Sequence, residues 1–230
     1  MPIGPVVRRM FGPYERQIAE AYRSIYIDID SYISTLLEWK PTALRILEVG
    51  CGEGAVTERL VKAYPAAQIT AIDITPRLGR LFQGPAERVT FIECAVQEIA
   101  ARDPAGFDLV LLSDVMHHVP EAFRQDLLDA ARAALAPGGA FVFKDWERTN
   151  APIHWMCHAS DRWLTGDKVA FMNRAEMRER LAKSFGESSL VAEARLAPWR
   201  NNLATLVRPP HEAEAAGAGA AAGTSVRAAA

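Results

Sequence analysis

The sequence predicts an α/β fold with a doubly wound parallel sheet, and three observations predict it. An apolar run at residues 44–49 leads into a glycine-rich turn at residues 50–54, after which a helix-like pattern begins. A second strand-like run ends in Asp73, roughly 20 residues beyond the turn. Strand-like and helix-like segments then alternate as far as Trp146, as a right-handed doubly wound sheet requires.

The N-terminal region is expected to be a helical cap, which we place at residues 1–40. Between residues 12 and 38, apolar side chains recur at helical spacing, and Lys40-Pro41 ends the pattern. This spacing predicts one or two amphipathic helices. Their aromatic residues, Tyr14 and Tyr22 among them, either face a substrate or make ordinary packing contacts.

The elements after the second strand continue the alternation. The third strand ends before Cys94, and residues 107–114 form the fourth, which runs into His117-His118. The sequence Pro137-Gly138-Gly139 predicts a turn between a helix and the fifth strand. We expect the main domain to cover residues 41–208.

The C-terminal third is expected to contain an insert, a hairpin and a tail. Residues 150–164 and 173–185 have helical patterns, and the segment from 146 to 172 predicts a helical insert over the site. Residues 189–196 and 202–208 predict the two strands of a hairpin. Residues 209–230 hold mostly small or polar side chains that cannot bury a core, so we expect a disordered tail.

The glycine turn and the acid after the second strand indicate a cofactor that contains a nucleoside. A carboxylate at Asp73 suits both ribose hydroxyls of an adenosine, and Gly50-x-Gly52-x-x-Ala55 also satisfies the pattern of NAD sites. Glu48 disfavours NAD, because a dinucleotide site has no need of an acid beside its pyrophosphate. An NAD-linked oxidoreductase and a non-catalytic cofactor-binding module remain alternatives.

With these landmarks in order, residues 40–144 resemble the class I S-adenosylmethionine-dependent methyltransferases. The resemblance implies a Rossmann-like, seven-stranded sheet with an antiparallel last strand, S-adenosylmethionine as cofactor and S-adenosylhomocysteine as product. One departure is Ala95, which stands where relatives often carry an acid that meets the adenine amino group. The implied cofactor contacts are Glu48, Gly50, Cys51 and Gly52 at the methionine end, Asp73 at the ribose, Ile74, Ala95 and Val96 around the adenine, and the Ser113 carbonyl near the cationic end.

Composition disfavours several classes of partner. The 230-residue chain is 50% hydrophobic, which is enough for one α/β core. Its net charge is −2 and it has no basic run, so we expect no nucleic-acid partner. No apolar run approaches the roughly 20 residues of a membrane span, so we expect no membrane partner. Three scattered cysteines are typical of reduced thiols, and we expect a cytoplasmic monomer or homodimer that acts on a small molecule.

Three residues just past the fourth and fifth strands are candidates for a catalytic base, namely His118, His117 and Asp145. Methyl transfer is an in-line displacement, and a hydroxyl acceptor benefits from a base that takes its proton. A neutral imidazole near physiological pH suits this role. Either histidine could instead only line the pocket or cap a turn.

The residue types of the cap and the insert predict the acceptor. Aromatic and polar side chains gather in both, which favours a pocket for a small, mostly apolar metabolite. We expect O-methylation in secondary metabolism, with C-methylation as the main alternative. The candidate substrate-binding residues are Tyr14, Tyr22, Trp146, His154, Trp155 and Arg162, the last as an anchor for an anionic group or as a partner in a salt bridge.

A metal site is the weaker interpretation of the histidines in the insert. His154 and His158 are four residues apart, so on a helix they could face one ion. Two histidines without an acid in the motif are a weak signal for a metal site, and histidines more often line pockets or pack in the core. We therefore expect no metal.

Overall fold

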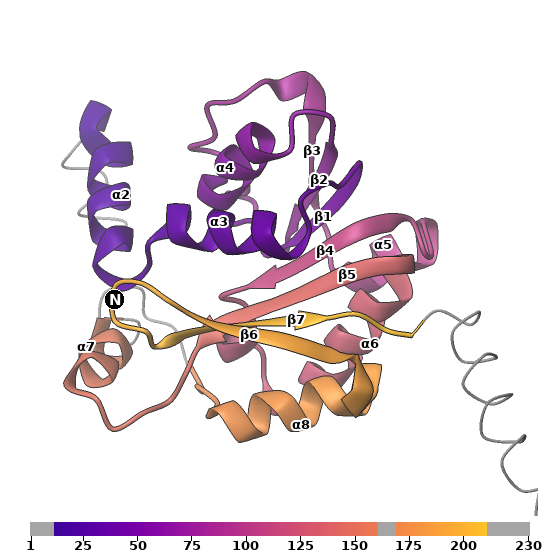
Figure 1. The fold of residues 1–230 in the computed structure, drawn as a ribbon. Helices are drawn as coiled ribbons and strands as arrows, with labels where there is room; N and C mark the ends of the chain where they lie inside the picture. Colours follow the sequence, from indigo (N-terminus) through magenta and orange to yellow (C-terminus); the bar gives the residue numbers. More distant parts are fainter. Residues whose placement is uncertain (1–11, 161–168, 211–230) are drawn as a thin grey trace, which may run out of the picture.

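The strands form one seven-stranded sheet, seen in the computed structural model, which describes residues 12–160 and 169–210 (Figure 1). The strand order is β3-β2-β1-β4-β5-β7-β6. Strands β1 to β5 are parallel, and β7 runs antiparallel between β5 and β6. The strands are β1 (Arg45–Val49), β2 (Gln68–Asp73), β3 (Val89–Glu93), β4 (Phe107–Ser113), β5 (Leu135–Trp146), β6 (Leu190–Leu196) and β7 (Asn202–Val207).

Helices cover both faces of this sheet. In Figure 1, α3 and α4 lie on one face and α6 and α8 on the other. Alternate residues of each strand supply the two cores, as the period of a strand requires. The α-helices are α2 (Glu15–Tyr26), α3 (Ile29–Trp39), α4 (Ala55–Ala63), α5 (Val96–Arg102), α6 (Arg124–Ala134), α7 (Pro152–Ser160) and α8 (Arg174–Phe185). The short 3₁₀ turns are η1 (Gly12–Tyr14), η2 (Ala86–Arg88), η3 (Met116–His118), η4 (Glu121–Phe123) and η6 (Glu187–Ser189).

The two N-terminal helices have different roles. Helix α3 begins at Asp28, whose side chain accepts a hydrogen bond from the Ser31 N–H at 3.0 Å, and it buries Tyr32 and Leu36 in the core on the α4 side. Helix α2 has no buried residue, although its sequence is amphipathic. The expected cap at residues 1–40 therefore enters the apolar core through α3, whereas α2 is held on α4 by ion pairs such as Arg16–Glu58 at 3.0 Å.

A hairpin loop at residues 197–201 ties these helices to the C-terminal strands. The Trp199 indole N–H donates to the Ile25 carbonyl at 2.6 Å, and the Asp28 N–H donates to the Ala197 carbonyl at 3.0 Å. The Asn202 side chain donates to the Tyr26 carbonyl at 2.7 Å. The start of α3 is thus fixed by the opposite end of the chain.

The predicted turn before the fifth strand is a bulge at the start of β5. Leu135 pairs with Phe107 and Ala140 with Leu109, so four residues of β5 lie opposite a single residue of β4. Gly138 takes φ of +73° within this bulge. The strand then continues to Trp146, where its carboxyl end meets that of β4.

The structure confirms the predicted fold class, including the antiparallel last strand and a helix after strand five. The tail beyond residue 210 and residues 1–11 lie outside the described part of the chain. Among the described helices, none is long and apolar enough to cross a membrane.

We expect Leu36→Ala to lower the free energy of unfolding by about 2–5 kcal/mol, because it leaves a cavity in the α3 core. Ile25→Ala on the exposed side of α2 is the control and should cost about 0.5 kcal/mol or less. Urea unfolding followed by circular dichroism measures both. Equal losses in the two variants would contradict the separation of α2 from the core.

Candidate active site

The glycine turn after β1 is folded onto the end of β2. The N–H groups of Gly50 and Cys51 both donate to the Ile72 carbonyl, at 2.8 and 2.9 Å. The Gly52 N–H donates to Asp73 Oδ2 at 2.8 Å. These three N–H groups therefore already have partners within the protein. The turn can instead offer a ligand its carbonyl oxygens and a backbone that the ligand can approach closely.

Gly50 is required here by its conformation and by its neighbour. Its φ is +79°, and a Cβ at this position would overlap the Cγ2 methyl of Val115. Val115 follows β4, so the segment after β4 packs directly on the glycine turn.

Asp73 lies at the carboxyl end of β2 with its carboxylate oriented by backbone groups. Oδ2 accepts from Gly52 and Oδ1 accepts from the Thr75 N–H at 3.0 Å. Each carboxylate oxygen can accept more than one hydrogen bond, so the group keeps acceptor capacity for a ligand.

Glu48 is buried behind the glycine turn. Thr57 Oγ1 of α4 donates to Glu48 Oε2 at 2.6 Å. Burial raises the pKa of Glu48 to about 8, and nearby Asp73 adds to the rise, although the hydrogen bond from Thr57 opposes it. Without a bound cation, Glu48 is therefore mostly protonated at neutral pH.

The other candidate cofactor residues differ in exposure. Ile74 is 75% exposed beside Asp73, whereas Val96 is buried in the core, so only its backbone can face a ligand. Ala95 precedes α5, and its N–H donates to Glu98. Cys51 is buried, and burial raises the pKa of its thiol, which stays protonated.

The segment after β4 is braced at two further points. Ser113 Oγ hydrogen bonds with the Tyr32 hydroxyl of α3 at 2.7 Å. Asp114 has φ of +58°, and its carboxylate accepts from Lys144 Nζ at 2.6 and 2.5 Å. Lys144 is only 1% exposed, and its carbonyl accepts from the Asp114 N–H at 2.9 Å. These bonds fix where residues 115–118 begin.

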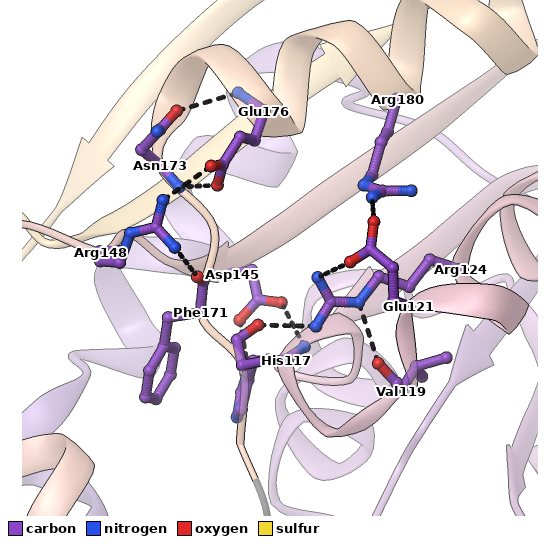
Figure 2. Close-up of polar contacts among 11 residues, drawn as sticks. His117, Val119, Glu121, Arg124, Asp145, Arg148, Phe171, Asn173, Glu176 and Arg180 are labelled. Carbon is purple, nitrogen blue, oxygen red and sulfur yellow. Dashed lines mark hydrogen bonds and ion pairs between the residues drawn. The ribbon is translucent and has the colours of Figure 1, made fainter.

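His117 and Asp145 form a buried dyad at the joined ends of β4 and β5 (Figure 2). Asp145 Oδ1 contacts His117 Nδ1, and Oδ2 accepts from the His117 N–H at 3.1 Å. Burial alone would raise the pKa of Asp145, but the charge and hydrogen bond of His117 outweigh it, so the pKa lies below its ordinary value. The structure thus pairs two of the three predicted catalytic residues.

His118 lies outside this dyad. It is exposed, and its ring centroid is 4.1 Å from that of His117. The sequence analysis named His118 first among the candidate bases, whereas the contact with Asp145 points to His117.

An aromatic group surrounds the dyad. Phe171 stacks on His117 with centroids 4.8 Å apart, and His154 meets the edge of Phe171 at 5.3 Å. The Trp146 indole N–H donates to His154 Nδ1 at 3.1 Å, so the neutral His154 ring carries its proton on Nε2. Burial lowers the pKa of His154, which favours this neutral form.

The predicted substrate-binding residues are only partly gathered here. Trp146 and His154 are buried beside Phe171. Tyr22 is exposed and contacts Tyr26, whose ring in turn packs edge-to-face with Trp146 at a centroid distance of 5.9 Å. Tyr14 and Trp155 are 66% and 67% exposed, because each lies on the outer side of its element. Arg162 lies outside the described residues.

Two contributors, Lys144 and Arg23, were not identified from the sequence. Lys144 looked like an ordinary strand residue, whereas Phe171 was expected only as one of several aromatic residues of the insert that line a chamber. Arg23 is half-buried near Glu53 and Asp114, and burial lowers its pKa. In the described ranges, no group of three His, Cys, Asp or Glu residues is arranged to hold a metal ion.

The chain is similar to a known family model and to a curated protein. Residues 46–139 match a family model described as a methyltransferase domain. The chain is 32% identical over 124 residues to a ubiquinone biosynthesis O-methyltransferase of Xanthomonas euvesicatoria pv. vesicatoria (strain 85-10). That match covers 52% of this chain and 49% of the relative, so the chain spans about half the length of the curated protein it matches.

Two solved structures show the same fold. The S-adenosylmethionine-dependent methyltransferase SibL in its apo form has a TM-score of 0.67 and 18% identity, covering 86% of this chain and 58% of that one. The 1,6-didemethyltoxoflavin-N1-methyltransferase of Burkholderia thailandensis, solved with bound 1,6-didemethyltoxoflavin and S-adenosylhomocysteine, has a TM-score of 0.61 and 18% identity. It covers 89% of this chain and 88% of its own.

We expect Glu48→Gln to change how the stability of the ligand-free protein depends on pH. A carboxyl with an ordinary pKa of about 4.3 when unfolded and about 8 when folded holds a proton that the unfolded chain has lost between these values. Glu48 therefore makes stability fall as pH rises through this window, by up to about 1.4 kcal/mol per pH unit. The glutamine variant should become more stable relative to the parent from pH 5 to 8. Urea titrations at several pH values measure this difference, and parallel curves would contradict it.

Proposed function

We propose that this chain, which fits the class I S-adenosylmethionine-dependent methyltransferase superfamily in its matched domain and its fold, transfers a methyl group to an oxygen of a small, mostly apolar metabolite. The observation that carries the proposal is the His117–Asp145 dyad, which lies two residues from the contact between Val115 and the glycine turn. A base and a cofactor cradle then meet at one edge of the sheet, where open α/β sheets bind ligands.

The residues around the glycine turn fit S-adenosylmethionine. Asp73 is oriented toward the turn and retains acceptor capacity for two ribose hydroxyls. Exposed Ile74 offers an apolar surface to an adenine, and the backbone of Ala95 and Val96 borders the same region. The carbonyls of Gly50 and Ser113, with Glu48 behind them, suit the positively charged methionine end.

In this proposal His117 is the base and Asp145 positions it. The contact of Asp145 with Nδ1 assigns the ring proton to that nitrogen and leaves the lone pair on Nε2. Nε2 takes the proton of the acceptor hydroxyl as its oxygen forms the new bond to the methyl carbon. The bound cofactor supplies that methyl group from its sulfonium and leaves as S-adenosylhomocysteine. Asp145 stabilises the imidazolium that results.

The surrounding side chains favour a small and mostly apolar acceptor. Trp146, Cys157 and Phe171 form one buried cluster, with Tyr26, Ile153 and Val169 against it. Such walls exclude water, which would otherwise compete for the methyl group. A net charge of −2 gives no attraction for nucleic acid.

The comparisons support an oxygen acceptor without deciding it. The relative in Xanthomonas is named an O-methyltransferase, whereas a solved neighbour is named an N1-methyltransferase. Oxygen is our choice because an imidazole held by a carboxylate suits removal of a hydroxyl proton. We also propose that the reaction belongs to secondary metabolism and takes place in the cytoplasm. Residues 41–208 form the main domain in this proposal, and the cap packs on it through α3.

We expect Asp73→Asn to weaken the binding of S-adenosylmethionine by at least about tenfold, because a charge-assisted hydrogen bond is worth about 1.5–3 kcal/mol. Asparagine keeps an acceptor for the Gly52 N–H and loses the one for the exposed Thr75 N–H, so the melting temperature should fall only slightly. The exposed Asp126→Asn serves as the matched control. Isothermal titration calorimetry with cofactor measures the affinity, and an unchanged dissociation constant would remove Asp73 from the site.

We expect His117→Ala to reduce turnover by about 10²–10⁴-fold, with cofactor affinity retained, because it removes the general base. His118→Ala is the matched neighbour and should stay within about threefold of the parent, since it lacks the contact with Asp145. Labelled cofactor with a panel of phenols, enols and amines measures methyl transfer. Full activity in both variants would leave positioning alone as the mechanism, and transfer only to amines would overturn the oxygen assignment.

A further inference from the structure

Residues 170–172 form a short strap, and each of its three carbonyl groups accepts a hydrogen bond from an arginine. The Ala170 carbonyl accepts from Arg124 Nη2 at 2.7 Å, and the Phe171 carbonyl from Arg148 Nη1 at 3.1 Å. The Met172 carbonyl accepts from the Arg148 N–H at 2.8 Å. Irregular backbone with every carbonyl paired is held in one position rather than several.

Arg124 of α6 anchors one end of the strap. It is buried, and besides Ala170 it donates to the Val119 carbonyl at 2.9 Å through Nε. Glu121 contacts its Nη1 at 3.4 Å and also pairs with Arg180 of α8 (Figure 2). Val119 lies just after η3, so a single guanidinium joins the strap to the turn that carries His117.

Arg148 anchors the other end through the start of α8. Its Nη2 donates to Glu176 Oε1 at 2.7 Å. Glu176 also accepts from the Asn173 N–H at 2.9 Å, while Asn173 Oδ1 caps the helix by accepting from the Glu176 N–H. Arg148 thus connects the strap to a helix end that is already fixed (Figure 2).

The strap contacts His117 in two ways that Asp145 does not provide. The Ala170 N–H donates to the His117 carbonyl at 2.8 Å, and the Phe171 ring covers a face of the imidazole. Asp145 holds the edge of the ring through Nδ1. An edge contact alone allows the ring to tilt, whereas an edge and a face together fix its plane.

We propose that Arg124 and Arg148 are positioning residues for His117, acting through Phe171 and the strap. This inference rests on the proposed function for its effect on turnover, because a base must lie in line with its proton to work well. The physical link, from two guanidinium groups to a strap and from the strap to the imidazole, is independent of which acceptor is methylated.

The test uses Arg148→Ala, because this side chain is half exposed and its loss leaves the core intact. We expect turnover to fall about tenfold while the cofactor dissociation constant is unchanged, since a small misplacement of a catalytic group is costly. Arg174→Ala is the matched control, because Arg174 is equally exposed and pairs with Glu193 away from the strap. It should retain parent turnover. Equal turnover in Arg148→Ala and the parent would overturn the proposal.

A double-mutant cycle separates action through His117 from a general loss of structure. In the His117→Ala background, Arg148→Ala should change the residual turnover by less than about twofold, because the group that it positions is absent. A tenfold loss in both backgrounds would show that Arg148 acts elsewhere, and would overturn the proposal. Phe171→Leu should reproduce the phenotype of Arg148→Ala, with both arginines intact.

A readout without turnover distinguishes this inference from the proposed function. In protein labelled with ¹⁵N-histidine, the ring resonances of His117 report its tautomer and titration. Arg148→Ala should shift them and change their titration midpoint, whereas Arg174→Ala should leave them in place. If they shift but His117→Ala remains active, the strap positions His117 and the base assignment is wrong. Unshifted resonances in Arg148→Ala would overturn the strap's role.

Discussion

The contact between Val115 and Gly50 is the constraint on which the candidate site depends. Only a glycine lets the segment after β4 lie against the turn after β1. That segment begins at Ser113, passes the Asp114–Lys144 pair and reaches His117 within one short 3₁₀ turn. The glycine turn and the candidate base are therefore parts of one packed unit, so a change in the packing of either one shifts the other.

Most of the fold could be predicted because its signals are local. The run at residues 44–49, the glycine turn and Asp73 each lie within a few residues of the element they define, and the alternation of strand and helix predicts a parallel, doubly wound sheet. The place of α3 could not be predicted in this way. Its apolar stripe resembles that of α2, and only tertiary packing distinguishes the helix that buries Tyr32 from the one that buries nothing.

The candidate site was predictable at the level of segments rather than of pairs. The sequence placed His117, His118 and Asp145 near one edge of the sheet, but the partner of Asp145 depends on the turn geometry between β4 and η3. Lys144 gave no signal and Phe171 was expected only as one of the aromatic residues of the insert, because a partly buried ion pair and a ring stacked across 54 residues of chain arise only from long-range contact. These contacts depend on how segments far apart in the chain pack against each other.

The hairpin loop at residues 197–201 has a consequence for how the chain is made. The Trp199–Ile25 and Asn202–Tyr26 bonds join positions 174 and 176 residues apart. These bonds beside the start of α3 therefore cannot form until the chain has been synthesised as far as β7. Contacts of this length form late, after local elements have collapsed. On the ribosome, the parallel half of the sheet can assemble before the hairpin loop holds the carboxyl end of α2. The nascent protein should therefore form the contact between Gly50 and Val115 before the contact between Trp199 and Ile25.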